Sequence, residues 1–209
     1  GYAVTGVFIK VWQPPFLACN WQEDREDAKA VAADLGIPFT TIDLVAAYKK
    51  AVVDSMIEEY RRGRTPNPDV MCNQHVKFGA FLEAAHKRGA EYVATGHYAQ
   101  AKSVNESAVS LYAGTDSSKD QSYFLWTLTH NQLSRILFPV GAMHKHEVRA
   151  RARRAGLSVA EKKDSQGVCF LGKLDMKQFL SEYLDLTPGD VLDTDGNVIG
   201  THPGTEIFT

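Results

Sequence analysis

Short apolar runs alternate with amphipathic stretches through the first hundred residues. Residues 2–11 and 39–44 are predicted as strands, because bulky apolar side chains cluster in both. Between them, the apolar positions of residues 23–35 recur at helical spacing, and Gly36 is predicted to end that helix. A third apolar run, residues 92–95, stops at Gly96. Strands separated by helices predict an α/β fold.

Two further helices are predicted before the third strand. Residues 46–62 place an apolar side chain at every fourth position, and residues 76–88 gather their apolar side chains on one face. Strands alternating with helices of this length are typical of a doubly wound parallel sheet, in which ligands bind at the carboxyl ends of the strands. We therefore expect the site at those ends.

The pattern changes after the third strand. Residues 99–104 and 109–113 are predicted as a β-hairpin, and Asp195-Gly196 within residues 189–200 indicates a second hairpin. Between the hairpins, helices are expected at residues 122–128, 131–136, 145–155 and 175–184. We interpret residues 1–140 as a catalytic domain, 141–186 as a helical extension with the second candidate thiol, and 187–209 as the start of a β-rich domain.

Composition restricts the class of protein. The chain has 209 residues, of which 44% are hydrophobic and 23% charged, and no apolar stretch approaches the roughly 20 residues of a membrane helix. No secretory signal is recognised, and the start at Gly1 suggests a fragment. The net charge of -2 argues against binding nucleic acid by bulk attraction, although arginines cluster at residues 61–64 and 149–154. Three cysteines predict a reducing compartment rather than a disulfide framework.

A polar segment with two prolines, residues 65–73, holds the first candidate site. It contains Asp69 and Cys72, which we expect near the start of the helix at residues 76–88, where a thiolate is favoured. The alternative is a rigid connector with a buried, inert Cys72. Cys72 and His75 also have half of a zinc-site spacing, but no second pair completes it.

The second candidate thiol is Cys169. It lies among glycines in residues 164–172, and we expect Lys162 and Lys163 to favour its thiolate. A structural cysteine is the alternative, but two thiols in polar loops together suggest sulfur exchange through a persulfide or a disulfide. Cys19 has no cation or glycine nearby and is interpreted as structural.

Two other segments carry polar groups. Residues 118–122 contain Lys119, Asp120 and Gln121 and precede an aromatic run, so they form either an N-cap turn or a surface for phosphate and bases of single-stranded RNA. His97 follows the third strand at the usual ligand position, although a lone histidine is more often a satisfied polar group.

Together these segments resemble the tRNA-specific 2-thiouridylase family of bacteria and mitochondria. The similarity runs along essentially the whole chain, and its most specific stretches are Gly-Arg-Thr-Pro-Asn-Pro-Asp at residues 63–69 and Lys-Asp-Gln-Ser-Tyr-Phe at residues 119–124. The other matching segments are residues 6–10, 72–73, 94–98 and 164–172. The resemblance implies a fold like that of the adenine nucleotide alpha hydrolases.

The resemblance also implies a reaction. ATP, with Mg²⁺, would adenylate the C2 oxygen of the wobble uridine, and a persulfide on Cys169 would then deliver sulfur, with Cys72 as the partner thiol that forms a disulfide. Asp69 would be the acid or base. The remaining implied contacts are Asn67 and Pro68 with the target base, Ile9 and Gly96 with the nucleotide, and His97, Lys119, Asp120 and Gln121 with tRNA.

The implied partners are tRNAs of the Glu, Gln and Lys type and a persulfide donor protein, and no membrane partner is expected. The expected location is the bacterial cytoplasm or, as the second choice, a mitochondrion. The family's Ser-Gly-Gly-Val-Asp-Ser phosphate loop is not in these residues, Ile9 stands where the family often has Met, and the family continues into a β-barrel after Thr209. We therefore expect the chain alone to be inactive. The rival hypotheses are another adenylating ATP pyrophosphatase, such as an amidotransferase-type synthetase, and an inactive RNA-binding fragment.

Overall fold

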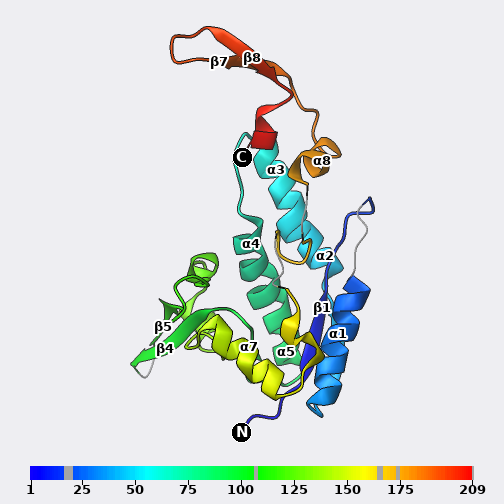
Figure 1. Cartoon of the computed structure of the whole chain (residues 1–209), viewed down its shortest axis with the longest axis vertical. Helices are drawn as coiled ribbons and strands as arrows, with labels where there is room; N and C mark the ends of the chain where they lie inside the picture. Colours follow the sequence, from blue (N-terminus) through cyan, green and yellow to red (C-terminus); the bar gives the residue numbers. More distant parts are fainter. Residues whose placement is uncertain (17–20, 106–107, 164–166, 173–174, 209) are drawn as a thin grey trace.

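Helices and short strands alternate through the body of the molecule (Figure 1). The computed structural model describes residues 1–16, 21–105, 108–163, 167–172 and 175–208. The strands are β1 (Gly6–Lys10), β2 (Phe39–Asp43), β3 (Val93–Ala94), β4 (Ala99–Asn105), β5 (Ala108–Ala113), β6 (Ile136–Leu137), β7 (Gly189–Leu192) and β8 (Val198–His202).

The helical elements include α-, 3₁₀- and π-helical segments. The α-helices are α1 (Trp21–Asp34), α2 (Val45–Tyr48), α3 (Ser55–Arg61), α4 (Pro68–Met71), α5 (Leu82–Lys87), α6 (His130–Leu133), α7 (Lys145–Arg154) and α8 (Met176–Ser181). The π-helical segments are η1 (Lys49–Asp54) and η2 (Cys72–Phe81), and the 3₁₀ segments are η3 (Ser122–Leu125), η4 (Ser158–Glu161) and η5 (Thr205–Phe208).

The strands pair in the way an α/β fold requires. β1 pairs in parallel with β2, and β3 pairs in parallel with β6. Among the described residues no ladder joins these two pairs, so the predicted continuous sheet is present as two parallel ribbons. α1 connects β1 to β2 and contacts both strands, as the βαβ pattern predicts, and Figure 1 shows it alongside β1.

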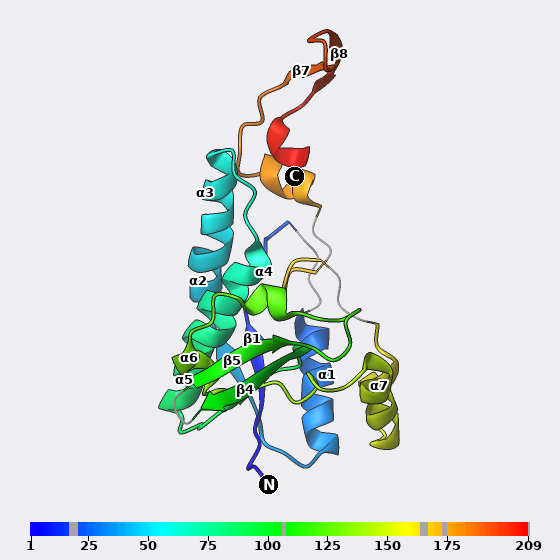
Figure 2. The same cartoon turned by 90° about the vertical axis from the view of Figure 1, so that its left-hand side faces the viewer.

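Two helical rods build the main core. α2, η1 and α3 run on from one another, as do α4, η2 and α5 (Figure 2). Tyr48 and Val52 of the first rod and Cys72 and Val76 of the second are at most 1% exposed and belong to one cluster. Phe179 of α8 joins this cluster. The sulfur of Cys72 is therefore part of the hydrophobic core.

The second rod begins earlier than the sequence analysis predicts. The helix starts at Pro68 rather than at residue 76, because the Asn67 side chain accepts hydrogen bonds from the backbone N–H groups of Asp69 and Val70. Proline at the first helical position has a suitable φ and no N–H to satisfy. Asn-Pro is thus a helix start here, and the predicted loop ends at Asn67.

Both predicted hairpins are present. β4 pairs with β5, and β7 with β8, each antiparallel. β7 and β8 project from one end of the molecule in both views (Figures 1 and 2). The helix predicted at residues 122–128 is the shorter 3₁₀ segment η3, and residues 131–136 divide between α6 and β6. No helix in the described part of the chain is long and apolar enough to cross a membrane.

Candidate active site at two cysteines

Cys72 and Cys169 lie together. Cys72 is 0% exposed in η2, and Cys169 packs against the same hydrophobic cluster from the turn before α8. The Cys72 thiol donates a hydrogen bond to the Cys169 sulfur, and both side chains are free thiols. The fold thus places in contact the two sulfur atoms singled out in the sequence.

Three side chains from distant parts of the chain hold residues 168–172, called here the Cys169 turn. The backbone N–H of Cys169 donates to Asp69 Oδ1 at 2.7 Å, and the Tyr48 hydroxyl donates to the Cys169 carbonyl oxygen at 2.7 Å. Gln13 Nε2 donates to the Phe170 carbonyl oxygen at 3.0 Å. Phe170 has φ of 66°, which costs energy for a non-glycine residue. These hydrogen bonds offset that cost and fix the sulfur over the second rod.

A lysine completes the sulfur site. Lys77 Nζ donates to Cys169 Sγ at 3.4 Å and lies 5.4 Å from the centre of the Phe170 ring. The hydrogen bond from Cys72 and the positive charge of Lys77 lower the pKa of Cys169, against the opposing effects of burial and Asp69. The same hydrogen bond, burial and Asp69 raise the pKa of Cys72. Of the two thiols, Cys169 is therefore the more readily ionised, and Cys72 keeps its proton more firmly.

Two parts of the sequence-based reasoning about the thiols are wrong. Cys72 does not gain thiolate character from a helix start, because it lies inside a continuous helix and its hydrogen bond to Cys169 raises its pKa. Lys162 does not supply the cation, because its Nζ pairs with Asp24 at 2.7 Å and Asp27 at 2.6 Å. Lys163 is exposed, and Lys77 fills the role assigned to these two lysines.

Lys77 could not be recognised from the sequence as a partner of the thiols, because the helix that carries them is π-helical at this point. In an α-helix five residues turn through about 500°, which would leave Cys72 and Lys77 about 140° apart. The wider i→i+5 hydrogen bonding of η2 brings the two positions closer to one face. The hydrogen bond from Tyr48 was also not predicted, because Tyr48 occupies one of several apolar positions in its helix.

The predicted nucleotide contacts lie at the strand ends. Ile9 is half-buried on β1, and Gly96 is exposed just after β3. Nothing lies within 4 Å of the point where a Cβ on Gly96 would stand, so its backbone is open to a ligand. Within the described residues no three His, Cys, Asp or Glu side chains gather to hold a metal ion, and His75 is exposed rather than paired with Cys72.

His97 is an interior residue. It is 8% exposed, packs between the rings of Phe78 and Phe138, and its Nδ1 lies 2.8 Å from Thr95 Oγ1. Burial, with a smaller effect of Lys77, lowers its pKa to about 3. His97 is thus neutral at physiological pH, and its predicted contact with tRNA stays a prediction.

Residues 119–121 form an ordered turn at the start of β4. Asp120 Oδ1 accepts from the Gly114 N–H at 2.7 Å, and Gln121 Oε1 accepts from the Tyr98 N–H at 3.0 Å. Lys119 is exposed beside them. The turn places Tyr123 and Trp126 on the surface, with 63% and 69% of each residue exposed.

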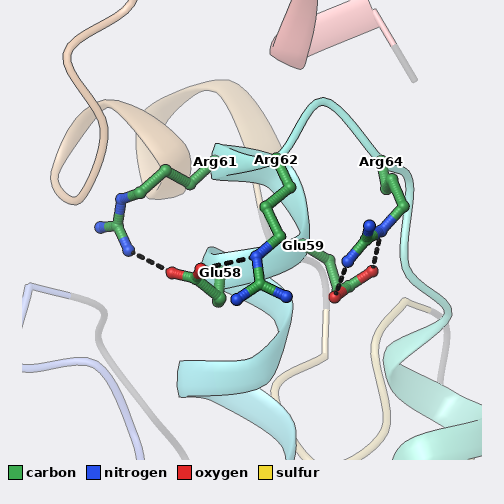
Figure 3. A network of polar contacts seen from close by, with 5 residues as sticks. All are labelled: Glu58, Glu59, Arg61, Arg62 and Arg64. Carbon is green, nitrogen blue, oxygen red and sulfur yellow. Dashed lines mark hydrogen bonds and ion pairs between the residues drawn. The ribbon is translucent and has the colours of Figure 1, made fainter.

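The arginines at the end of α3 are ion-paired with glutamates of the same helix (Figure 3). Arg61 and Arg62 both contact Glu58 at 2.8 Å, and Arg64 makes two bonds to Glu59, at 2.5 and 2.6 Å. These pairs neutralise part of the predicted basic cluster.

The α/β fold agrees with the comparison against known families. Residues 1–173 match the tRNA methyl transferase HUP domain, and the chain belongs to that family.

The chain is also similar to three curated bacterial proteins, each named tRNA-specific 2-thiouridylase MnmA. The identity is 49% for the protein of Listeria monocytogenes, 49% for that of Halalkalibacterium halodurans and 47% for that of Streptococcus sanguinis. Each alignment covers 100% of this chain and 57% of the relative. The chain therefore spans a little over half the length of the relatives it matches.

Proposed function

We propose that the full-length protein containing this chain is an ATP-dependent tRNA 2-thiouridylase, which replaces O2 of the wobble uridine with sulfur. The contact between Cys72 and Cys169 is the observation that carries this proposal. The contact lies beside Asp69, whose carboxylate binds the backbone N–H of Cys169 although the two residues are 100 positions apart in the sequence. The chain is also similar to proteins named tRNA-specific 2-thiouridylase. A synthetase of the amidotransferase type would have no use for two facing thiols.

The proposed sulfur transfer assigns one role to each thiol. The Cys169 thiolate attacks the outer sulfur of a persulfide on a donor protein, the donor's S–S bond breaks, and the donor leaves as a thiolate. Cys169 then carries the persulfide. The lowering of the Cys169 pKa by Cys72 and Lys77 supports its role as the first nucleophile, because the thiolate is the reactive form.

Transfer to tRNA follows. The substrate ATP supplies an adenylyl group that makes O2 of uridine a leaving group. The outer sulfur on Cys169 attacks C2, and O2 departs with AMP. Cys72 loses its proton and attacks Cys169 Sγ, the S–S bond breaks, and its electron pair remains on the sulfur of 2-thiouridine. A Cys72–Cys169 disulfide results, and a thiol reductant restores both thiols. We assign Asp69 as the acid or base at the uridine.

We assign Ile9 and Gly96 to the nucleotide. The open backbone at Gly96, just beyond β3, supports this role, because ligands of open α/β sheets bind at the carboxyl ends of strands. The phosphate loop expected from the resemblance would have to precede Gly1. Mg²⁺ bound with ATP would take most of its ligands from phosphates and water, since no acidic cluster gathers in the described residues.

We assign Asn67, Pro68, His97 and residues 119–121 to the target base and tRNA. The exposed rings of Tyr123 and Trp126 beside Lys119 support this assignment, because aromatic faces stack on unpaired bases and lysine attracts phosphate. We further propose the Glu, Gln and Lys tRNAs as substrates, a cytoplasmic location and a separate persulfide donor. The domain limits at residues 140 and 186 also remain a proposal.

The test uses cells that lack the gene and carry the full-length protein on a plasmid. Mass spectrometry of digested tRNA measures 2-thiouridine at the wobble position. We expect Cys72→Ser and Cys169→Ser each to abolish it, while Cys19→Ser, a matched loss of one thiol outside the pair, retains it. If the gene deletion leaves 2-thiouridine unchanged, the proposed function is wrong. If either active-site serine variant restores the modification, the role of that thiol is wrong.

A further inference from the structure

We propose that Lys77 is the charge partner that holds the sulfur of Cys169 as an anion, both as the free thiolate and as the persulfide it becomes. The first observation is geometric. Lys77 Nζ lies 3.4 Å from Cys169 Sγ and is held over the Phe170 ring. The ring of Phe170, the residue after Cys169, thus holds the Lys77 ammonium close to the Cys169 sulfur. This inference deepens the proposed function and rests on it only for the persulfide.

The helix makes this position specific. Lys77 and Cys72 both reach Cys169 from η2, the neutral thiol as a hydrogen-bond donor and the lysine as a cation. π-helical turns are rare and are found frequently at functional sites. Here the π-helical segment brings a thiol and a cation five residues apart to one sulfur atom.

The other groups that face Cys169 cannot replace Lys77. Asp69 of α4 is an acid whose charge opposes a thiolate, and Tyr48 of α2 is neutral, because burial raises the pKa of its hydroxyl. Cys72 donates one hydrogen bond but carries no charge. Among the described groups that act on Cys169, Lys77 therefore supplies the positive charge. It stabilises a negative charge on the Cys169 sulfur, which burial and Asp69 disfavour.

The test measures the pKa of Cys169 directly. The full-length protein is alkylated with iodoacetamide from pH 5 to 10, and the rate at Cys169 is followed by mass spectrometry of its peptide. In the unsubstituted protein we expect a midpoint below the pKa of about 8.5 of an ordinary cysteine. A midpoint at or above that value overturns the proposal without any variant.

Three variants isolate the charge. Lys77→Met should raise the midpoint by about 1 unit or more, the usual effect of removing an opposite charge within hydrogen-bonding distance. Lys77→Arg should retain most of the shift. Lys87→Met removes an exposed lysine about 15 Å further along the same rod and should change nothing. Equal midpoints for Lys77→Met and Lys87→Met would overturn the proposal, provided that circular dichroism shows both variants folded.

The same variants separate this inference from the proposed function. We expect Lys77→Met to reduce wobble 2-thiouridine in the complementation assay and Lys77→Arg to restore part of it. If Lys77→Met shifts the midpoint but thiolation survives in Cys169→Ser, the role of Lys77 as charge partner stands and the proposed thiouridylase function is wrong. If Lys77→Met leaves the midpoint unchanged and thiolation is lost in Cys169→Ser, the proposed function stands and the role of Lys77 is wrong.

Discussion

Removing the hydroxyl of Tyr48 should release the Cys169 turn. That hydroxyl donates to the Cys169 carbonyl at 2.7 Å, while the Tyr48 ring is 0% exposed and packs edge-on to Phe170. Tyr48→Phe keeps the ring, so no cavity forms and only the hydrogen bond is lost. A neutral hydrogen bond contributes about 0.5 to 1.5 kcal/mol net. The bond is part-buried, so we expect its loss to cost a value within that range.

The cost converts into a rate that can be measured. If the turn must open before a bulky maleimide reaches Cys169, a loss of about 0.5 to 1.5 kcal/mol raises the open population about 2- to 12-fold. Maleimide labelling of Cys169 at fixed pH should accelerate by that factor in Tyr48→Phe. Tyr112→Phe, which removes an exposed hydroxyl from β5, serves as the control. Equal labelling rates for Tyr48→Phe and the unsubstituted protein would refute the idea that this hydrogen bond holds the turn.

Three further predictions concern the surroundings of the site. Asn67→Ala should lower stability by about 1 kcal/mol in urea unfolding, because α4 loses its N-cap, whereas Asn67→Asp should not. His97 has a folded pKa of about 3, below its unfolded value near 6.5, so its contribution is complete above pH 6.5 and is lost as the pH falls toward 3. Between pH 7 and pH 5 the loss should reach up to about 2 kcal/mol, and His97→Gln should flatten that part of the urea profile. Gly96→Ala should leave the melting temperature unchanged and weaken ATP binding, whereas Gly141→Ala, whose Cβ would lie 1.7 Å from the Ala99 carbonyl oxygen, should prevent stable folding.

Much of the fold could be predicted because local signals and tertiary packing agree. Gly36, in a left-handed conformation, ends α1 where its position predicted, and the hairpins form at the segments with turn residues. The start of α4 was missed because Asn67-Pro68 is equally compatible with a turn, and only the cap hydrogen bonds distinguish the two. The match to the tRNA methyl transferase HUP domain confirms the α/β class.

The site could be predicted only in part. The two thiols were identifiable as cysteines in polar, glycine- or proline-containing segments, but their contact depends on packing between residues far apart in the chain. The wrong cation was chosen because Lys162 and Lys163 are near Cys169 in sequence, whereas Lys77 is near it in space. A lysine near a thiol in the sequence does not show which cation acts on that thiol, because the lysine can be paired with carboxylates elsewhere. Lys162 is paired in this way with Asp24 and Asp27.

The continuity of the second rod has a mechanical consequence. Asp69, Cys72 and Lys77 follow one another on a single uninterrupted helix, so their separations cannot change without unwinding it. Cys169 lies instead on a short turn, which hydrogen-bonds to the side chains of Asp69 and Lys77 on that helix. If the distance between Cys169 and these three residues changes during the proposed sulfur transfer, we therefore expect the turn to change position and the helix to keep its own.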